Sequence, residues 1–228
     1  MGLGIQGNAG VVAEVDGTGY RALRVTPRPV EQGSLGFYQL NMTSGTLAAA
    51  LAAGAQLFSM RWGDATRLLV LYHLSLKFQG LTPRTALTLT DFGFDAYVAR
   101  AFSVSASGGT VATLTGNSFK TRTSQGTTLL TDARISTTAA LTAGTQTLDG
   151  NAFFGSLGVP QRVNPAAATE ELVNINPELI WQPNTSNGES PIILAQNEGI
   201  VLRNRTVWPA AGTGIVTVNA RWAEVAAY

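Results

Sequence analysis

The chain has 228 residues, of which 45% are hydrophobic and only 13% charged, and this length is sufficient for one large β-sandwich domain. Fifteen basic residues are scattered among fourteen acidic ones for a formal net charge of +1, which argues against nucleic acid as a partner. The absence of cysteine excludes disulfides and thiolate metal sites, and with a single histidine we predict no metal and no cofactor.

The N-terminal residues 1–30 are predicted to form an arm and a hairpin ahead of a single main domain, 31–228. The first ten residues are rich in glycine and lack the basic start and apolar run of a secretory signal. Residues 11–15 and 19–25 read as strands joined by a turn at Asp16–Gly19. Because no stretch of the sequence approaches the roughly 18 apolar residues of a membrane span, we expect a soluble protein made in the cytoplasm, without a membrane partner.

Strand-like alternation dominates the main domain. From Leu68 to Phe78 the even positions are apolar or aromatic, whereas His73, Ser75 and Lys77 occupy odd positions, which predicts one buried face and one wetter face. The segment Ile215–Trp222 repeats this pattern. Further strands are predicted at 36–42, 55–62, 85–89, 97–104, 110–114, 128–137, 191–194 and 199–204. Many short strands separated by turns predict an all-β protein, a jelly-roll-like antiparallel β-sandwich.

Three stretches depart from the alternation. Residues 45–55 have high helix propensity but no amphipathic stripe, so a helical turn and an irregular strand both remain open. Residues 165–181 offer a helix start at Thr169 that Pro177 limits. Residues 144–187 are rich in Gly, Pro and Asn, which indicates long connections. We therefore expect at most two short helices, together with long loops.

A few ionisable residues are candidates for chemistry. His73 has no nucleophile or carboxylate near it in the sequence, so an ordinary strand histidine is favoured over a catalytic one. Asp91 and Asp95 flank a glycine, and turn carboxylates are favoured over a calcium site or an acid–base pair. An enzyme that acts on glycosides through Asp91, Asp95 or Glu198 is a minor hypothesis. The main prediction is that the chain has no catalytic residues and is not an enzyme.

Arginine and tryptophan dominate interface hot spots, and their side chains can stack on each other. Packing in the core or at its rim is the competing explanation for each of them. The candidate interface residues are Arg61, Trp62, Arg203, Trp208, Arg221 and Trp222.

The tetrad Gln196-Asn197-Glu198-Gly199 interrupts two apolar runs near the C-terminus. It offers a carboxylate and amides to a ligand, but the same residues suit a tight bend. Ile192 and Leu194 lie on one face before the insert, and Ile200 and Leu202 resume the alternation after it. The sequence therefore favours a structural turn, with Gly199 suited to positive φ and Asn197 or Glu198 accepting backbone N–H bonds.

Three blocks of the sequence resemble a group of tailed-bacteriophage virion proteins. The segment "SPIILAQNEGIVLRNRTVWPAAGTGIVTVNARWAEV" resembles the closing segment of that group, in which "P-L-x-L-A-x-x-E-G" precedes a strand and the last strand ends in "W-A-E". The segments "AAGAQLFSMRWGDATRLLVLYHLSLKF" and "ISTTAALTAGTQTLD" are also similar, so that about half of the chain is covered. Residues 144–187 show no such pattern over most of their length.

The resemblance implies a virion structural protein of the jelly-roll capsid decoration or cement type. Its expected partners are the major capsid protein and copies of itself in a homo-oligomer such as a trimer, and its expected location is the capsid surface. The alternative is a tail-fibre or receptor-binding module that recognises a glycan of the host surface. The motifs that carry the resemblance are structural rather than catalytic.

Overall fold

The structure is a computed structural model, and all its described residues belong to the second of the two units into which the chain divides, Gln32–Tyr228. The described residues are 35–82, 93–155, 163–164, 169–170, 174–184, 188–208 and 212–226. The predicted N-terminal arm and hairpin, the predicted strand 85–89 and Asp91 lie outside them.

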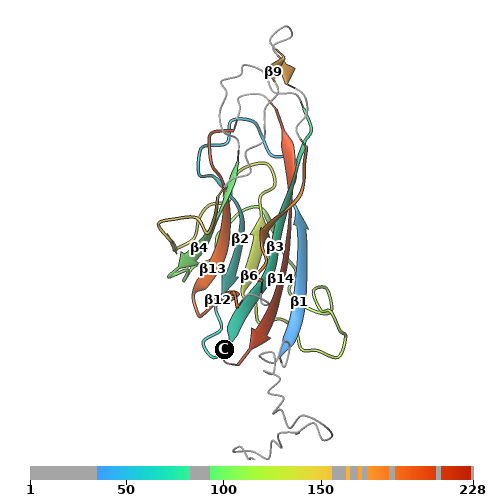
Figure 1. Ribbon diagram of the computed structural model, residues 1–228, viewed down its shortest axis with the longest axis vertical. Coiled ribbons are helices and arrows are strands. Elements are labelled where there is room, and N and C mark those ends of the chain that lie inside the picture. Colours follow the sequence, from blue (N-terminus) through green and yellow to red (C-terminus); the bar gives the residue numbers. More distant parts are fainter. Residues whose placement is uncertain are drawn as a thin grey trace, which may run out of the picture. The chain divides into compact units, whose positions relative to one another are not determined.

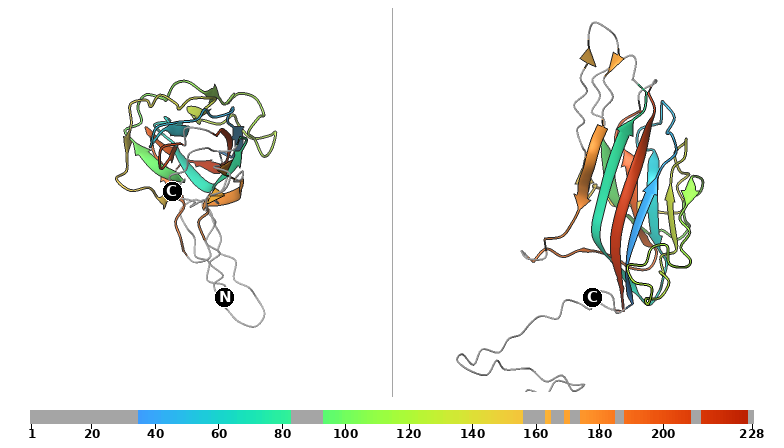
Figure 2. Two further views of the ribbon diagram at one scale, coloured as in Figure 1. Left: turned by 90° about the horizontal axis from the view of Figure 1, so that it is seen from above. Right: turned by 90° about the vertical axis from the view of Figure 1, so that its right-hand side faces the viewer.

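The fold is an all-β antiparallel sandwich, which confirms the predicted fold class, and its two sheets face each other in Figure 2. The first sheet has the order β1–β14–β3–β11, and β12 pairs with β3 beyond the end of β11. Its strands are β1 (Gly36–Thr43), β14 (Gly214–Val225), β3 (Leu68–Gly80), β11 (Asn174–Trp181) and β12 (Ile192–Leu194).

The second sheet has the order β5–β6–β2–β13–β4–β7, and β8 also pairs with β4. Its strands are β5 (Thr110–Val111), β6 (Asp132–Ile135), β2 (Gln56–Trp62), β13 (Glu198–Asn204), β4 (Phe94–Arg100), β7 (Thr147–Leu148) and β8 (Phe154–Gly155). A separate two-stranded pair joins β9 (Val163–Asn164) to β10 (Thr169–Glu170).

The strand order is that of a jelly roll. For this comparison β5, β6, β9 and β10 are left out, β7 and β8 count as one strand, and β11 and β12 count as another. Numbered along the chain in this way, the first sheet contains strands one, eight, three and six in spatial order. The second sheet takes the second, seventh, fourth and fifth. The segment between β4 and β7 contributes β5 and β6, which extend the second sheet beyond β2 (Figure 1).

Large aromatic side chains from both sheets fill the space between them. Phe78 of β3 contacts Phe94 of β4 at 5.8 Å between ring centroids, and it meets Trp208 edge-on at 5.4 Å. Tyr38 of β1 stacks on Trp222 of β14 at 5.7 Å. Burial of such side chains is the dominant stabilising term in a sandwich of this kind.

A bulge in β3 changes the alternation that the sequence predicts. Arg221 and Trp222 are adjacent in β14, yet they pair with His73 and Leu71, so one residue of β3 is left over. Beyond the bulge, Leu74, Leu76 and Phe78 face the core as expected. Before it, the core residues are Leu69 and Leu71, while Tyr72 contacts the ring of Phe37. The prediction that the even positions from Leu68 to Tyr72 form the buried face was therefore wrong for Leu68 and Tyr72, which are half-buried, although Val70 is buried.

The remaining corrections concern helices and strand limits. No helix occurs among the described residues, and residues 45–55 form turns around an isolated bridge at Leu47. Thr169, the predicted helix start, lies in β10 instead. The supposed connection 144–187 contains β7 to β11. The predicted strand 97–104 ends at Arg100, because the left-handed φ of 47° at Ala101 breaks the extended backbone.

The outer faces of the two sheets differ. On the second sheet, Phe102 packs with Ala99 and Val201 in a small buried cluster, so the chain that follows β4 covers this face. On the first sheet, Gln39, Asn41 and Arg221 are exposed. The part of the chain that the structure describes contains no helix with the length and hydrophobicity of a membrane span.

Candidate functional site

The tetrad Gln196–Gly199 is the corner at which the chain leaves the first sheet for the second. It joins β12 to β13, and the N–H of Glu198 donates to the carbonyl of Ala195 at 3.1 Å, which closes a β-turn. The carboxylate of Glu198 accepts the N–H of Ala195 at 2.8 Å, as predicted for a capping residue. Leu194, Ile200 and Leu202 are buried on either side of the corner.

The backbone conformation of the corner differs from the prediction in one respect. Asn197, with a φ of 58°, is the left-handed residue, and Gly199 has no positive φ. Gly199 is required for a different reason: a Cβ there would lie 2.2 Å from the carbonyl oxygen of Met60 and 2.7 Å from the Phe102 ring. Glycine therefore allows β2 and the Phe102 segment to approach β13 closely.

Arg61 joins three segments at this corner. Its guanidinium donates to the carbonyl of Phe102, to Oγ of Ser105 at 3.4 Å and to Oδ1 of Asn197 at 3.2 Å. The side chain of Asn197 thus accepts from an arginine rather than from a backbone N–H. Because these hydrogen bonds engage its guanidinium within the chain, Arg61 stabilises the corner.

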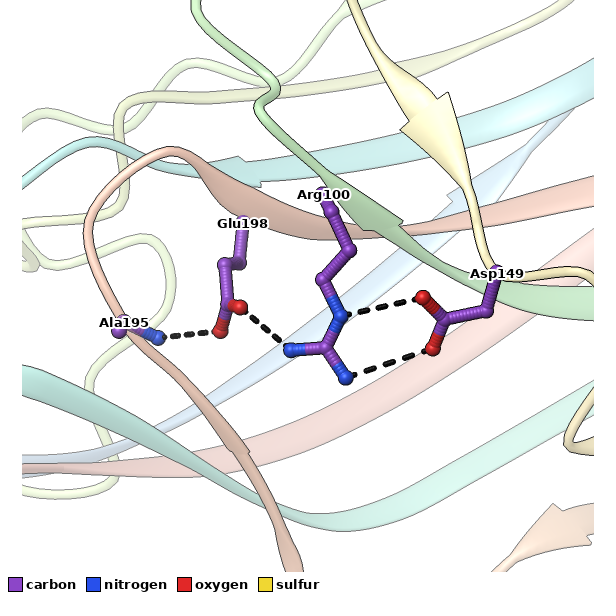
Figure 3. A network of polar contacts seen from close by, with 4 residues as sticks. All are labelled: Arg100, Asp149, Ala195 and Glu198. Carbon is purple, nitrogen blue, oxygen red and sulfur yellow. Dashed lines mark hydrogen bonds and ion pairs between the residues drawn. The ribbon is translucent and has the colours of Figure 1, made fainter.

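A second arginine holds the same corner from its exposed side (Figure 3). Arg100, the last residue of β4, makes an ion pair with Asp149, Nε to Oδ1 at 3.1 Å, and another with Glu198. These carboxylates raise the pKa of Arg100, mainly through the hydrogen bonds that its guanidinium donates to Asp149 and then to Glu198. Glu198 therefore divides its two oxygens between Arg100 and the N–H of Ala195.

The three tryptophans among the candidate interface residues lie in the core. Trp62, Trp208 and Trp222 are each 0% exposed. Their indole N–H groups are satisfied internally by the carbonyl of Arg67, the carbonyl of Gly212 and the carboxylate of Glu224. Their positions match the packing alternative, and their side chains offer no surface to a partner.

The other arginines of that set occupy different faces. Arg203 is half-buried on β13, opposite Asp95 of β4, and its Nε has no hydrogen-bond partner among the described residues. Arg221 is exposed on the outer face of the first sheet. Arg61, Arg203 and Arg221 therefore do not form one patch, because Arg221 lies on the sheet opposite the other two.

Asp95 and Glu198, the two described carboxylates among those considered for catalysis, are far apart, and each makes an ion pair. Asp95 makes an ion pair with Arg205, Oδ1 to Nη2 at 2.9 Å. Asp95 lies opposite Arg203, and Glu198 lies five residues farther along β13, roughly 17 Å away at about 3.4 Å per residue. That separation is too long for a pair of catalytic carboxylates. No cluster of three or more His, Asp or Glu side chains that could hold a metal ion occurs among the described residues.

One depression of about 550 Å³ lies on the outer face of the first sheet. Its floor is two rows of cross-strand neighbours, in which Arg221 pairs with Gln39 and His73, and Asn219 pairs with Asn41 and Ser75. Segment 118–119 lines one side. Its lining residues are Gln39, Leu40, Asn41, His73, Ser75, Ser118, Phe119, Asn219, Ala220 and Arg221.

The sequence indicated only part of this depression. The alternation placed His73 and Ser75 on the wetter face of one strand and Asn219 and Arg221 on the wetter face of another. The pairing of those strands with each other and with β1 is a long-range property of the fold, and Phe119 carried no periodic signal at all. None of the residues that line the depression carries a carboxylate, and His73 makes no hydrogen bond to the hydroxyls of Ser75 or Ser118 that also line it.

Two buried titratable groups lie on the opposite side of β1 and β14. Burial raises the pKa of Tyr38 to about 12, with a further contribution from the charge of Glu224, and its hydroxyl donates to the carbonyl of Gly126 at 3.0 Å. Burial also raises the pKa of Glu224, although its carboxylate accepts bonds from Thr128, Leu129 and Trp222 that act in the other direction. Both groups face the core, away from the depression.

Comparisons of the chain with protein-family models, curated proteins and solved structures found no match.

Proposed function

We propose that the chain is a structural component of a bacteriophage virion, a capsid decoration protein that contacts the major capsid protein and copies of itself. The observation that carries the proposal is the place of the C-terminal segment that resembles such proteins. Residues 190–225 form β12, β13 and β14, and β13 and β14 are interior strands of the two sheets. The resemblance therefore involves residues that determine the sandwich itself.

The charged groups of the described region support a structural rather than a catalytic role. Arg61, Arg100 and Arg205 are engaged in contacts that join loops to strands, and the carboxylates of Asp95, Asp149 and Glu198 are their partners or lie beside them. A protein that works by adding contacts to a shell needs a rigid body of this kind. Its affinity comes from many weak contacts repeated over many copies.

The free edge of the first sheet supports self-association. The edge positions are β11 and β12, which pair only with β3 among the described strands. Unpaired edges of sandwiches must be protected or covered, and oligomerisation is one way to cover them. Leu179 of β11 is 48% exposed at this edge, which adds apolar surface that a second copy would bury.

The test combines a mass in solution with a location in the particle. Light scattering of the purified chain is expected to give a discrete homo-oligomer at micromolar concentration. Cryo-microscopy of the virions that contain the chain is expected to show it at regular positions on the head. A location confined to the tail, or particles without copies on the head, would refute the decoration role.

A further inference from the structure

The depression on the first sheet has the size and openness to solvent that a small ligand needs. Its volume of about 550 Å³ lies within the usual range for ligand pockets, about 300–1,000 Å³. The equivalent face of the second sheet is closed by the cluster around Phe102. The sandwich therefore keeps one of its two outer faces open, and the depression lies on that face.

The floor of the depression is a regular array of polar side chains. Cross-strand neighbours stand about 4.5–5.5 Å apart at Cβ, so Gln39, Arg221 and His73 form one row across β1, β14 and β3. Asn41, Asn219 and Ser75 form the next row. Amides and hydroxyls both donate and accept hydrogen bonds, which is the pattern that the ring hydroxyls of a sugar require.

The side wall is fixed to the sheet before any ligand arrives. The backbone N–H of Gln39 donates to the carbonyl of Phe119 at 2.9 Å, and Oγ1 of Thr121 donates to the carbonyl of Phe37 at 2.9 Å. Farther along the same loop, the hydroxyl of Tyr38 holds the carbonyl of Gly126. A wall held by these bonds loses little conformational entropy on binding, so the depression is preorganised.

The charge of the depression points to an acidic ligand. None of the residues that line it carries a carboxylate, although the chain as a whole is nearly balanced in charge. Cross-strand pairs often join opposite charges, but the two neighbours of Arg221 are Gln39 and His73. Arg221 makes no ion pair with another described residue, so its guanidinium is available to a carboxylate from outside.

We propose that this depression binds an acidic saccharide, a chain of sugars that carry carboxylates. Arg221 binds the carboxylate of one sugar through two parallel N–H bonds, a geometry that lysine does not provide. The amides of Gln39, Asn41 and Asn219 bind hydroxyls, and Phe119 offers apolar surface to the C–H groups of a sugar ring. Binding here is a further function, which does not depend on a place on the capsid.

The only histidine of the chain reports directly on the site. Because His73 lines the depression, the imidazole signals of the protein in an NMR spectrum come from this place alone. Titration of the full chain with trigalacturonic acid is expected to shift these signals in a saturable way. The carboxyl-reduced trimer, which keeps the sugar rings but lacks the charge, is expected to bind at least about tenfold more weakly.

Two variants separate specific binding from general charge attraction. Arg221→Ala is expected to weaken binding of the trimer at least about tenfold. Lys77→Ala removes a positive charge from the same side of the sheet but outside the lining, two positions from Ser75, and is expected to leave the affinity unchanged. Circular dichroism checks that both variants keep the fold, as expected for exposed residues.

Four results would overturn the proposal. They are the absence of a saturable shift, equal binding of the charged and reduced trimers, equal losses in the two variants, and an equal shift with inorganic phosphate at the same concentration. The last result would show a simple anion site without recognition of a sugar.

Discussion

Oδ1 of Asn197 accepts a hydrogen bond from Nη2 of Arg61 at 3.2 Å, across the corner between the two sheets. The backbone of Asn197 is also tied down, because its N–H donates to the carbonyl of Trp62 at 2.8 Å and its carbonyl accepts from Phe102 at 2.7 Å. One residue therefore connects the end of β2, the turn and the chain after β4. The stability of the corner should depend on this residue more than on its neighbours.

Substitutions at Asn197 separate its backbone role from its side-chain role. Asn197→Ala loses the bond to Arg61. It also places alanine, which lacks the local hydrogen bonds of an asparagine side chain, in the left-handed region, and this conformation by itself costs about 1–2 kcal/mol. Asn197→Gly loses the bond but accepts the φ of 58°. In urea unfolding, we expect the glycine variant to be about 1 kcal/mol more stable than the alanine variant. The neighbouring exposed Gln196→Ala should change the free energy of unfolding by less than about 0.5 kcal/mol, and an equal loss there would contradict a special role for Asn197.

Gly199→Ala should be among the most damaging single-methyl additions in the chain. The new Cβ would lie 2.2 Å from the Met60 carbonyl oxygen, and backbone of a central strand pair cannot move aside easily. We expect a loss of about 2 kcal/mol or more in the free energy of unfolding, measured by urea denaturation. Gly150→Ala is the matched control, because a Cβ there meets nothing within 4 Å. Similar stability of the two variants would show that β13 tolerates the extra atom.

The ion pairs of Arg100 should contribute little to stability, despite their good geometry. Its side chain is 47% exposed, and exposed pairs usually contribute about 0–1 kcal/mol. We expect Glu198→Gln to lower the free energy of unfolding by less than about 1 kcal/mol, since glutamine still accepts the N–H of Ala195. The loss should shrink in 1 M salt, where such pairs are screened.

Asp149→Asn, which removes the other partner of Arg100, is the matched comparison and should behave similarly. A loss of several kcal/mol from Glu198→Gln alone, insensitive to salt, would mean that the charge of Glu198 has a buried role at the corner.

The alternation of apolar residues predicted most strands of the sandwich but not its edge. β14 alternates between buried and more exposed positions from Gly214 to Trp222, because one of its faces is buried, whereas both faces of β2 are largely buried. β11 was missed because Pro177 interrupts it. In the structure Pro177 lies where the register shifts between Ile175 and Glu178, on a strand that pairs only with β3 among the described strands, and there a missing N–H is tolerated.

The geometry of the open face could not be predicted from local patterns. The wetter positions of β1, β3 and β14 were visible separately, but their register joins segments more than a hundred residues apart. No sequence signal marks the bulge opposite Arg221 and Trp222. Because of this bulge, the side chains of both Tyr72 and His73 lie outside the core. Register of this kind depends on the packing of all strands together.

Glu224 should make stability depend on pH. It is 1% exposed, and burial raises the pKa of its carboxyl above the ordinary value for glutamic acid. The folded state therefore holds the proton more tightly than the unfolded chain. Its stabilising effect is complete below the unfolded pKa and is lost as pH rises through the folded pKa.

Urea unfolding across this range should show Glu224→Gln losing less stability with rising pH than the parent chain, because glutamine keeps an acceptor for Leu129 and Trp222 but cannot ionise. Asp64, whose pKa is lowered mainly by the N–H of Thr66, contributes with the opposite sign in both proteins, and its charge also raises the pKa of Glu224 in the parent chain. Identical pH profiles would show that the bonds to the carboxylate offset its burial completely.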